Sequence, residues 1–327
     1  MKSDITIAFI SAFHTPFIQD DLEILEKHFH VRKLIGSGIL HVFRIILGVL
    51  RSDVVFCWFA SVYAFMGVVA GKVFGVKSIV IVGGVDAAKD KELDYGIWLS
   101  PWRAVLVRYV FRNAEKVLVV DPCLRDEAIR LASYDGNNIM YVPTGYDSNF
   151  WKFIGEKQPF VLTVAVVRDN RNILRKGIDL LIEAARQLQQ IQFTVIGVEP
   201  NIVLPLRPPL NVTFHALMPR SDLLPFYQQA KVYCQPSRRE GLPNSLCEAM
   251  LCGCIPVATN VSGNPTAIGD AGILISSGDI QALVSALQFA MTLDDSIATK
   301  ARMRAVSLFS QQKRVNELLR LVKELTR

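Results

Sequence analysis

The sequence predicts an α/β protein built from two doubly wound, Rossmann-like domains that face one another across a cleft. Short apolar runs of β type alternate with helical stretches along the whole chain. These runs are continuously apolar, as strands are when helices cover both faces of a parallel sheet. At 327 residues the chain is also too long for one ordinary core. In such folds ligands bind at the carboxyl ends of the strands, which would place the cleft there.

The first half contains the first set of alternating elements. Residues 54–71 carry no formal charge over 18 positions, the lower limit for a membrane-spanning helix. Because this stretch opens with the strand-like VVFCW and continues with Ser61, Tyr63, Gly67 and Gly71, a strand followed by a buried helix is favoured. Strands are expected at 5–10, 54–58, 79–82, 117–120 and 139–142, and helices at 20–29, 60–74, 101–112 and 124–133.

The second half repeats the alternation after a hinge at 143–160, which is rich in turn formers. Strands are expected at 160–164, 193–196, 212–214, 232–234 and 255–258, and helices at 177–189, 223–229, 244–251 and 279–292. Apolar residues at helical spacing close the chain. We therefore expect an N-terminal Rossmann-like domain at 1–150, a second Rossmann-like domain at 151–309, and a helix at 310–327 that packs back toward the N-terminal domain.

Composition and charge restrict the class of partner. Half of the residues are apolar and a fifth are charged, as in globular proteins. Lys and Arg balance Asp and Glu at 16 against 16 over 1–150, but outnumber them 20 to 14 over 151–327. The basic excess suits a phosphate-bearing ligand, whereas the lack of a basic run or aromatic–basic repeat argues against nucleic acid. Six cysteines without metal-ligand spacing and no signal-peptide pattern favour a reducing, cytoplasmic location.

The most informative segment is SRREGLPNSLCEAMLCGCIPVATNVSGNP, residues 237–265. Seven residues separate Glu240 from Glu248, and Asn244 is the expected N-cap of a helix that begins between them. A helix start offers unpaired N–H groups and partial positive charge to a phosphate, and a carboxylate can accept from two sugar hydroxyls. Either glutamate alone fits a dipole-complementing or solvated acid. The full string predicts a pocket for a molecule that is part sugar and part diphosphate.

Three stretches carry a resemblance to a known family: PTGYDSNF (143–150), VRDNRNILRKGIDLLIEA (167–184) and NVTFHALMPRSDLLPFYQQAKVYCQPS (211–237). With the glutamate pair, they make the chain similar to the GT-B-fold glycosyltransferases. It resembles in particular the retaining glycosyltransferase family 4 and its "glycosyl transferases group 1" domain. The likeness is strongest over about 140–327 and weaker upstream. It implies that the domain at 1–150 is the acceptor side and that the domain at 151–309 binds the nucleotide-sugar donor.

This resemblance implies roles for individual residues. Glu240 would contact hydroxyls of the transferred sugar and Glu248 the ribose of the nucleotide. Arg168 and Lys176 would neutralise the diphosphate, whose negative charge grows as it departs. Enzymes of this fold typically need no bound metal, so we expect neither a metal site nor a cofactor besides the donor substrate. The remaining donor-binding residues would be Gly241, Leu242, Pro243, Asn244 and Ser245.

The N-terminal half departs from the family pattern. Ser11-Ala12-Phe13-His14 stands where relatives often have two glycines, and no histidine follows the strand at 79–82. His14 and Asp86 are the candidates for polar roles near the cleft. A loop histidine is more often structural than catalytic, and Asp86 equally fits a turn acid. Thr266 stands where many relatives have glutamate.

The resemblance implies a hexosyltransferase that moves a sugar from a nucleotide-diphosphate sugar to a glycan, a lipid-linked glycan or another hydroxyl acceptor, with retention of configuration. Its products would belong to polysaccharide or glycolipid biosynthesis. The stretch 95–112, with Trp98, Trp102 and three arginines, fits an interfacial helix that touches anionic lipid. A core-facing helix with a solvated basic side is favoured, and peripheral membrane contact stays open.

Two other classes of protein compete with this interpretation. A dinucleotide oxidoreductase shares the architecture, but no Gly-x-Gly-x-x-Gly follows the first strand. A sugar-nucleotide-binding protein without transferase activity, or a GT-B-fold sugar-nucleotide epimerase, remains compatible with the altered N-terminal loops.

Overall fold

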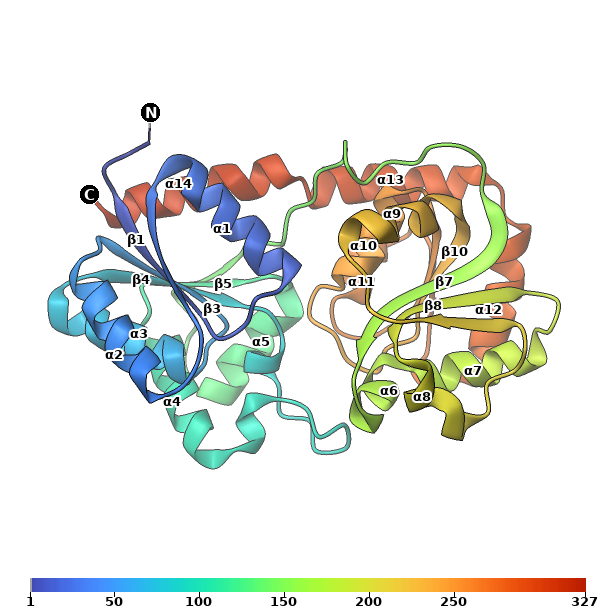
Figure 1. Ribbon diagram of the computed structural model, residues 1–327, viewed down its shortest axis with the longest axis horizontal. Coiled ribbons are helices and arrows are strands. Elements are labelled where there is room, and N and C mark those ends of the chain that lie inside the picture. The colour runs from blue at the N-terminus through green and yellow to red at the C-terminus, as the bar shows by residue number, and fades with distance from the viewer. Residues whose placement is uncertain (1) are drawn as a thin grey trace. The chain divides into compact units, whose positions relative to one another are not determined.

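The computed structural model describes residues 2–327, which divide into two compact units. Unit 1 comprises the chain up to Gly145 together with Gln312–Arg327, and unit 2 comprises Tyr146–Gln311. Each unit contains one six-stranded, entirely parallel sheet with helices on both faces (Figure 1). The predicted α/β class with two doubly wound sheets is therefore confirmed.

The sheet of unit 1 has the strand order β2-β1-β3-β4-β5-β6. Right-handed crossovers place α1 on one face, where α14 joins it, and α2 to α5 on the other (Figure 1). The strands are β1 (Thr6–Ser11), β2 (His30–Ile35), β3 (Val54–Trp58), β4 (Lys77–Val82), β5 (Lys116–Val119) and β6 (Ile139–Tyr141). The helices are α1 (Pro16–His28), α2 (Ile39–Leu50), α3 (Val62–Phe74), α4 (Pro101–Asn113), α5 (Pro122–Ala132) and α14 (Gln311–Leu325).

The sheet of unit 2 has the order β12-β11-β10-β7-β8-β9. The strands are β7 (Gln158–Val167), β8 (Gln192–Val198), β9 (Val212–His215), β10 (Ala230–Gln235), β11 (Ile255–Thr259) and β12 (Ile273–Ile275). The helices are α6 (Asn170–Lys176), α7 (Ile178–Gln187), α8 (Pro200–Val203), α9 (Arg220–Gln229), α10 (Asn244–Leu251), α11 (Asn264–Ile268), α12 (Ile280–Thr292) and α13 (Asp295–Leu308).

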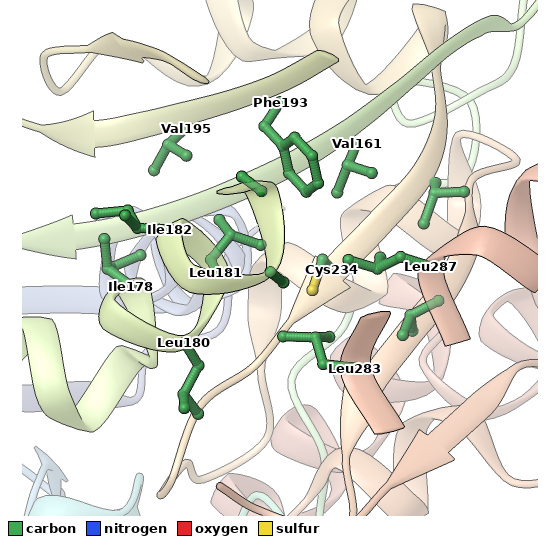
Figure 2. Close-up of a cluster of buried hydrophobic side chains, with 14 of the residues drawn as sticks. Val161, Ile178, Leu180, Leu181, Ile182, Phe193, Val195, Cys234, Leu283 and Leu287 are labelled. Carbon is green, nitrogen blue, oxygen red and sulfur yellow. The ribbon is translucent and has the colours of Figure 1, made fainter. Parts of the chain in front are cut away.

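The core of unit 2 explains why its apolar runs form strands. Val161, Phe193 and Val195 on the sheet pack toward Leu181 of α7 and Leu287 of α12, in one cluster of buried side chains (Figure 2). Strand residues of this kind are buried because helices cover the sheet. This burial fixes β7 and β10, whose carboxyl ends carry the segments that the sequence singles out.

A buried ion pair fastens α14 to unit 1. Arg314 donates from Nε and Nη2 to the two carboxylate oxygens of Asp21 on α1 (3.0 and 2.6 Å), and both side chains are almost fully buried. Arg314 Nη1 also donates to the carbonyl of Val142 (2.7 Å), and Trp58 Nε1 donates to Asp21 (2.9 Å). Helix α14 thus contributes a buried side chain to the core of the unit that contains α1.

Within residues 2–327, no helix combines the length and the apolar character needed to cross a membrane.

Candidate functional site

The segment that carries the glutamate pair leaves the carboxyl end of β10 and leads into α10. Glu240 lies in this loop and is buried. Its N–H donates to Ser262 Oγ (3.1 Å), and Gly263 N–H donates to the carbonyl of Gly241 (3.1 Å). Because β10 and β11 are adjacent parallel strands, the loops that follow them meet at one edge of the sheet.

Three side chains converge on a single oxygen of Glu240. Its Oε1 accepts from Lys176 Nζ (2.6 Å), Ser237 Oγ (2.7 Å) and Gln235 Nε2 (2.9 Å). No hydrogen bond from residues 2–327 reaches Oε2, so this second oxygen can accept from a ligand. Burial raises the pKa of Glu240, but the charge of Lys176 and its hydrogen bonds outweigh burial and hold the pKa below its ordinary value. Glu240 is therefore a carboxylate at neutral pH.

Lys176 is the last residue of α6, and Gly177 determines where it points. Gly177 caps the helix in the left-handed conformation (φ 67°), and a Cβ on it would lie 2.0 Å from the carbonyl oxygen of Pro236. The glycine thus lets the end of α6 lie directly against the loop that follows β10. Burial lowers the pKa of Lys176, while the pairing with Glu240 raises it, with a net lowering.

Arg238 ties the same loop to α7. Its N–H donates to the carbonyl of Arg175 (2.8 Å), and its guanidinium forms a two-pronged ion pair with Asp179 (2.8 and 2.7 Å). Such bidentate pairs fix geometry as well as charge. The bonds of Arg238 to Arg175 and Asp179 therefore fix the position of Glu240 relative to Lys176.

Arg168 lies elsewhere in this region. It follows β7 at the carboxyl edge of the same sheet and is exposed. The structure brings Lys176 to Glu240 but shows no contact between Arg168 and either of them. Asp169, the next residue, caps α6 by accepting from the N–H of Asn172 (2.8 Å).

The N-terminus of α10 differs from the prediction in one detail. The N-cap residue is Pro243, so the prediction that Asn244 caps the helix is wrong. Asn244 is the first helical residue, and its Oδ1 accepts from Tyr146 Oη (2.5 Å) instead. The first intrahelical bond runs from Cys247 N–H to the carbonyl of Pro243 (3.2 Å), so the N–H groups of residues 245 and 246 have no acceptor within the helix. Gly241, Leu242 and Pro243 form the buried turn before it, and Ser245 Oγ donates to Gln235 Oε1 (3.4 Å).

Glu248 lies one turn inside α10 and is buried. One carboxylate oxygen accepts from Tyr227 Oη (3.1 Å), and the other pairs with Arg220 (3.2 Å). Burial and the negative charge of Glu248 raise the pKa of Tyr227 well above its ordinary value, which keeps this phenol protonated as a donor.

Uncharged side chains connect the two glutamates, and sequence reasoning missed them. The ring of Tyr227 lies 5.9 Å from that of Tyr233, whose Oη donates to Gln235 Oε1 (2.9 Å). Gln235 in turn donates to Glu240. The available signal for Gln235 was a polar residue directly after the buried run Val232–Cys234, at the edge where the site forms.

The two candidates of unit 1 differ in their surroundings. His14 is exposed in the loop between β1 and α1. Asp86 is fully buried, and its carboxylate accepts from the N–H groups of Ala60 (2.9 Å), Gly83 (3.1 Å) and Gly84 (2.9 Å). Burial raises its pKa to about 6 despite these bonds. Asp86 therefore braces the turn that follows β4.

Among the residues that the structure describes, no three His, Cys, Asp or Glu side chains gather as a metal site would require.

Comparison with known proteins identifies the second half of the chain. Residues 159–292 match the family described as "Glycosyl transferases group 1". The matched part includes α6, the loop after β10 and α10. The resemblance of this part to the glycosyl transferases group 1 domain is confirmed.

Two curated relatives extend the match. The O-antigen chain mannosyltransferase B of Escherichia coli is 26% identical over 220 residues, which cover 61% of this chain and 58% of the relative. The N,N'-diacetylbacillosaminyl-diphospho-undecaprenol alpha-1,3-N-acetylgalactosaminyltransferase of Campylobacter jejuni is 31% identical over 136 residues, or 40% of this chain and 35% of the relative. The chain thus matches only part of the length of these relatives.

Solved structures share the whole fold. HepE of Anabaena, in complex with UDP-glucose, superposes with a TM-score of 0.80 at 15% identity and covers 98% of this chain and 100% of that one. Sucrose-phosphate synthase of Thermosynechococcus elongatus gives a TM-score of 0.78 at 17% identity, covering 98% and 99%. These likenesses confirm the GT-B fold.

Proposed function

We propose that this protein is a glycosyltransferase that moves a sugar from a nucleotide-diphosphate sugar to a hydroxyl acceptor, with retention of the anomeric configuration. One observation carries the proposal: a buried glutamate held by a lysine at one oxygen, with its second oxygen available, beside the N-terminus of α10. Sugar hydroxyls and phosphates need these two kinds of group next to each other.

We assign the donor-binding roles from this geometry. Glu240 Oε2 accepts from hydroxyls of the transferred sugar. The N–H groups at the start of α10, with the turn Gly241–Pro243, receive phosphate oxygens. Lys176, already charged against Glu240, and the exposed Arg168 neutralise the diphosphate.

For Glu248 we propose the ribose of the nucleotide as ligand. This role requires the Glu248 carboxylate to exchange its contact with Tyr227 or Arg220 for hydrogen bonds from ribose hydroxyls.

The reaction then needs mainly positioning and charge stabilisation. The bond between the anomeric carbon and the diphosphate oxygen breaks, and a bond to the acceptor oxygen forms on the same face. The acceptor proton passes to the departing phosphate oxygen. Lys176 and the helix dipole stabilise charge that is largest in the transition state, which is where such groups accelerate a reaction. We propose no metal and no cofactor for this route.

The relatives suggest the classes of substrate. The names of two of them refer to an O-antigen chain and to a diphospho-undecaprenol-linked sugar, and HepE was solved in complex with UDP-glucose. We propose by analogy a hexose or N-acetylhexosamine donor and a glycan or lipid-linked glycan as acceptor.

Acceptor-dependent release of nucleoside diphosphate tests the proposal. A thermal-shift screen across nucleotide-sugars first identifies the donor, because a ligand of the folded state raises the Tm. Release that requires added acceptor, with a new glycosidic product, is the expected result. Donor binding without turnover would favour a sugar-nucleotide-binding protein. Conversion of the donor sugar without acceptor would favour an epimerase.

A further inference from the structure

The most exposed apolar surface of unit 1 lies on α2. Large apolar side chains along this helix are 53–75% exposed, and on a helix of 3.6 residues per turn they fall within an arc of about 100°. His41, Ile45 and Val49 form the opposite, buried face. The helix is thus apolar on both its buried and its outer face, and the side chains of the outer stripe are exposed. That outer stripe consists of Ile39, Leu40, Phe43, Leu47 and Leu50.

The helices beside α2 extend this surface. α2 packs against α3 and α3 against α4, all on one face of the sheet (Figure 1). α4 faces the core with Ala104, Val107 and Val110, in agreement with the prediction of a core-facing helix at 101–112. However, Trp102 at its start is 56% exposed, and the Arg103 guanidinium lies over its ring, 5.2 Å from the centroid.

Charge on the three helices has a single sign. Together α2, α3 and α4 contain no Asp or Glu. In contrast, α1 on the other face of the sheet contains Asp20, Asp21, Glu23 and Glu26. Lys72 is neutralised by Glu115 from the loop before β5, whereas Arg108 and Arg112 bond to backbone carbonyls and keep their charge. The basic residues of the three helices are Arg44, Lys72, Arg103, Arg108 and Arg112.

We propose that the outer face of α2, flanked by α3 and α4, docks on the surface of a lipid bilayer that contains anionic lipid. An apolar stripe bordered by cations and free of acids is the pattern of a helix that lies in the interfacial plane. Spanning is excluded for α2 itself: at 12 residues it is about 18 Å long, against about 30 Å of hydrocarbon. The absence of acids is what favours a lipid surface over a protein surface, whose rim carries both signs.

Vesicle co-sedimentation of the full chain tests this docking, and needs no donor or acceptor. We expect binding to vesicles of phosphatidylcholine with phosphatidylglycerol, weaker binding at high salt, and little binding to phosphatidylcholine alone. Phe43→Ser with Leu47→Ser, and separately Arg44→Glu with Arg103→Glu, should each weaken binding roughly tenfold or more. Phe289→Ser on α12 and Lys323→Glu on α14 are matched surface controls and should bind like the wild type.

The four variants alter exposed side chains, so an unchanged Tm verifies that each is folded. Absence of binding to anionic vesicles at low salt would overturn the proposal, as would wild-type binding by both double variants. Sedimentation velocity separates the main rival. A dimer that Phe43→Ser with Leu47→Ser dissociates, in a chain that ignores vesicles, would assign the stripe to a second copy of the protein and refute the lipid surface.

Discussion

Gly177 and Pro236 approach so closely that only a glycine fits at position 177. A Cβ there would lie 2.0 Å from the Pro236 carbonyl oxygen, a backbone atom that has no easy way to move. This contact sets the end of α6 against the loop after β10, and thereby Lys176 against Glu240. The geometry of the candidate site therefore depends on a residue without a side chain.

Gly177→Ala should destabilise unit 2 by roughly 2 kcal/mol or more, because left-handed strain and the clash add. Denaturant unfolding measures the loss. Gly75→Ala is the matched control: Gly75 also caps a helix in the left-handed conformation (φ 73°), but nothing lies within 4 Å of its Cβ position. Only the strain should appear there, at about 1 kcal/mol. Equal losses at the two positions would show that Pro236 does not constrain Gly177.

Breaking the Lys176–Glu240 pair should affect stability and turnover differently. Lys176→Met alone or Glu240→Gln alone leaves a buried charge without its partner and should cost about 3 kcal/mol of unfolding free energy. The double variant should regain much of this stability. Turnover should fall by roughly 10²–10³ or more in all three, because the groups act on the substrate. A double variant that is both stable and fully active would remove these residues from the proposed mechanism.

The same pair should make stability depend on pH. The pKa of Glu240 is depressed in the folded protein, so the unfolded state takes up its proton first as the pH falls. The contribution of the pair is therefore present above the unfolded pKa of about 4.3 and is lost as the pH falls through the lower folded pKa. Unfolding free energies of wild type and double variant, compared from pH 6 downward, should converge. A constant difference would contradict the depressed pKa.

Asp86→Asn should behave as a structural substitution. Its carboxylate accepts three backbone N–H groups, and an amide must turn a donor toward one of them. We expect a loss of about 1–3 kcal/mol in unfolding free energy, with donor affinity unchanged under conditions where the variant is folded. If the fold keeps its stability and donor binding is lost, Asp86 acts at the ligand instead.

Arg314→Met should destabilise unit 1 by about 3–5 kcal/mol, since it leaves the buried Asp21 carboxylate without a counter-charge and with Trp58 as its remaining side-chain donor. Arg320→Met on the same helix removes an exposed ion pair with Glu317 and should change stability by about 1 kcal/mol or less. Similar effects of the two substitutions in denaturant unfolding would mean that burial does not distinguish the pairs.

The sequence predicts a strand or helix correctly where its local pattern of apolar residues reflects burial. The apolar run VVFCW predicts β3 with the bounds that the structure shows, because both faces of a central strand are covered. β2 was not predicted because it is an edge strand that pairs only with β1 and carries the charged residues Arg32 and Lys33. α13 escaped because its buried stripe consists of alanines, which give a weak periodic signal.

The site was readable only in part, for a similar reason. The spacing of Glu240 and Glu248 revealed the loop and helix, since both lie within one short segment. The hydrogen bond between Lys176 and Glu240 joins residues 64 positions apart, so no local pattern predicts it. The roles of Gln235 and Ser237 were not predicted because both side chains are uncharged. Asn244 fails as N-cap because Pro243 takes that position and Tyr146 occupies the amide oxygen.

The anchoring of α14 bears on how the chain is made. Unit 1 is discontinuous in sequence: it combines the residues up to Gly145 with Gln312–Arg327, and unit 2 is inserted between these two segments. During synthesis, Asp21 and Trp58 can therefore contact Arg314 only after the whole of unit 2 has been made. The inserted unit, which is contiguous, can fold before the one that precedes it, an inversion of the usual N-to-C order.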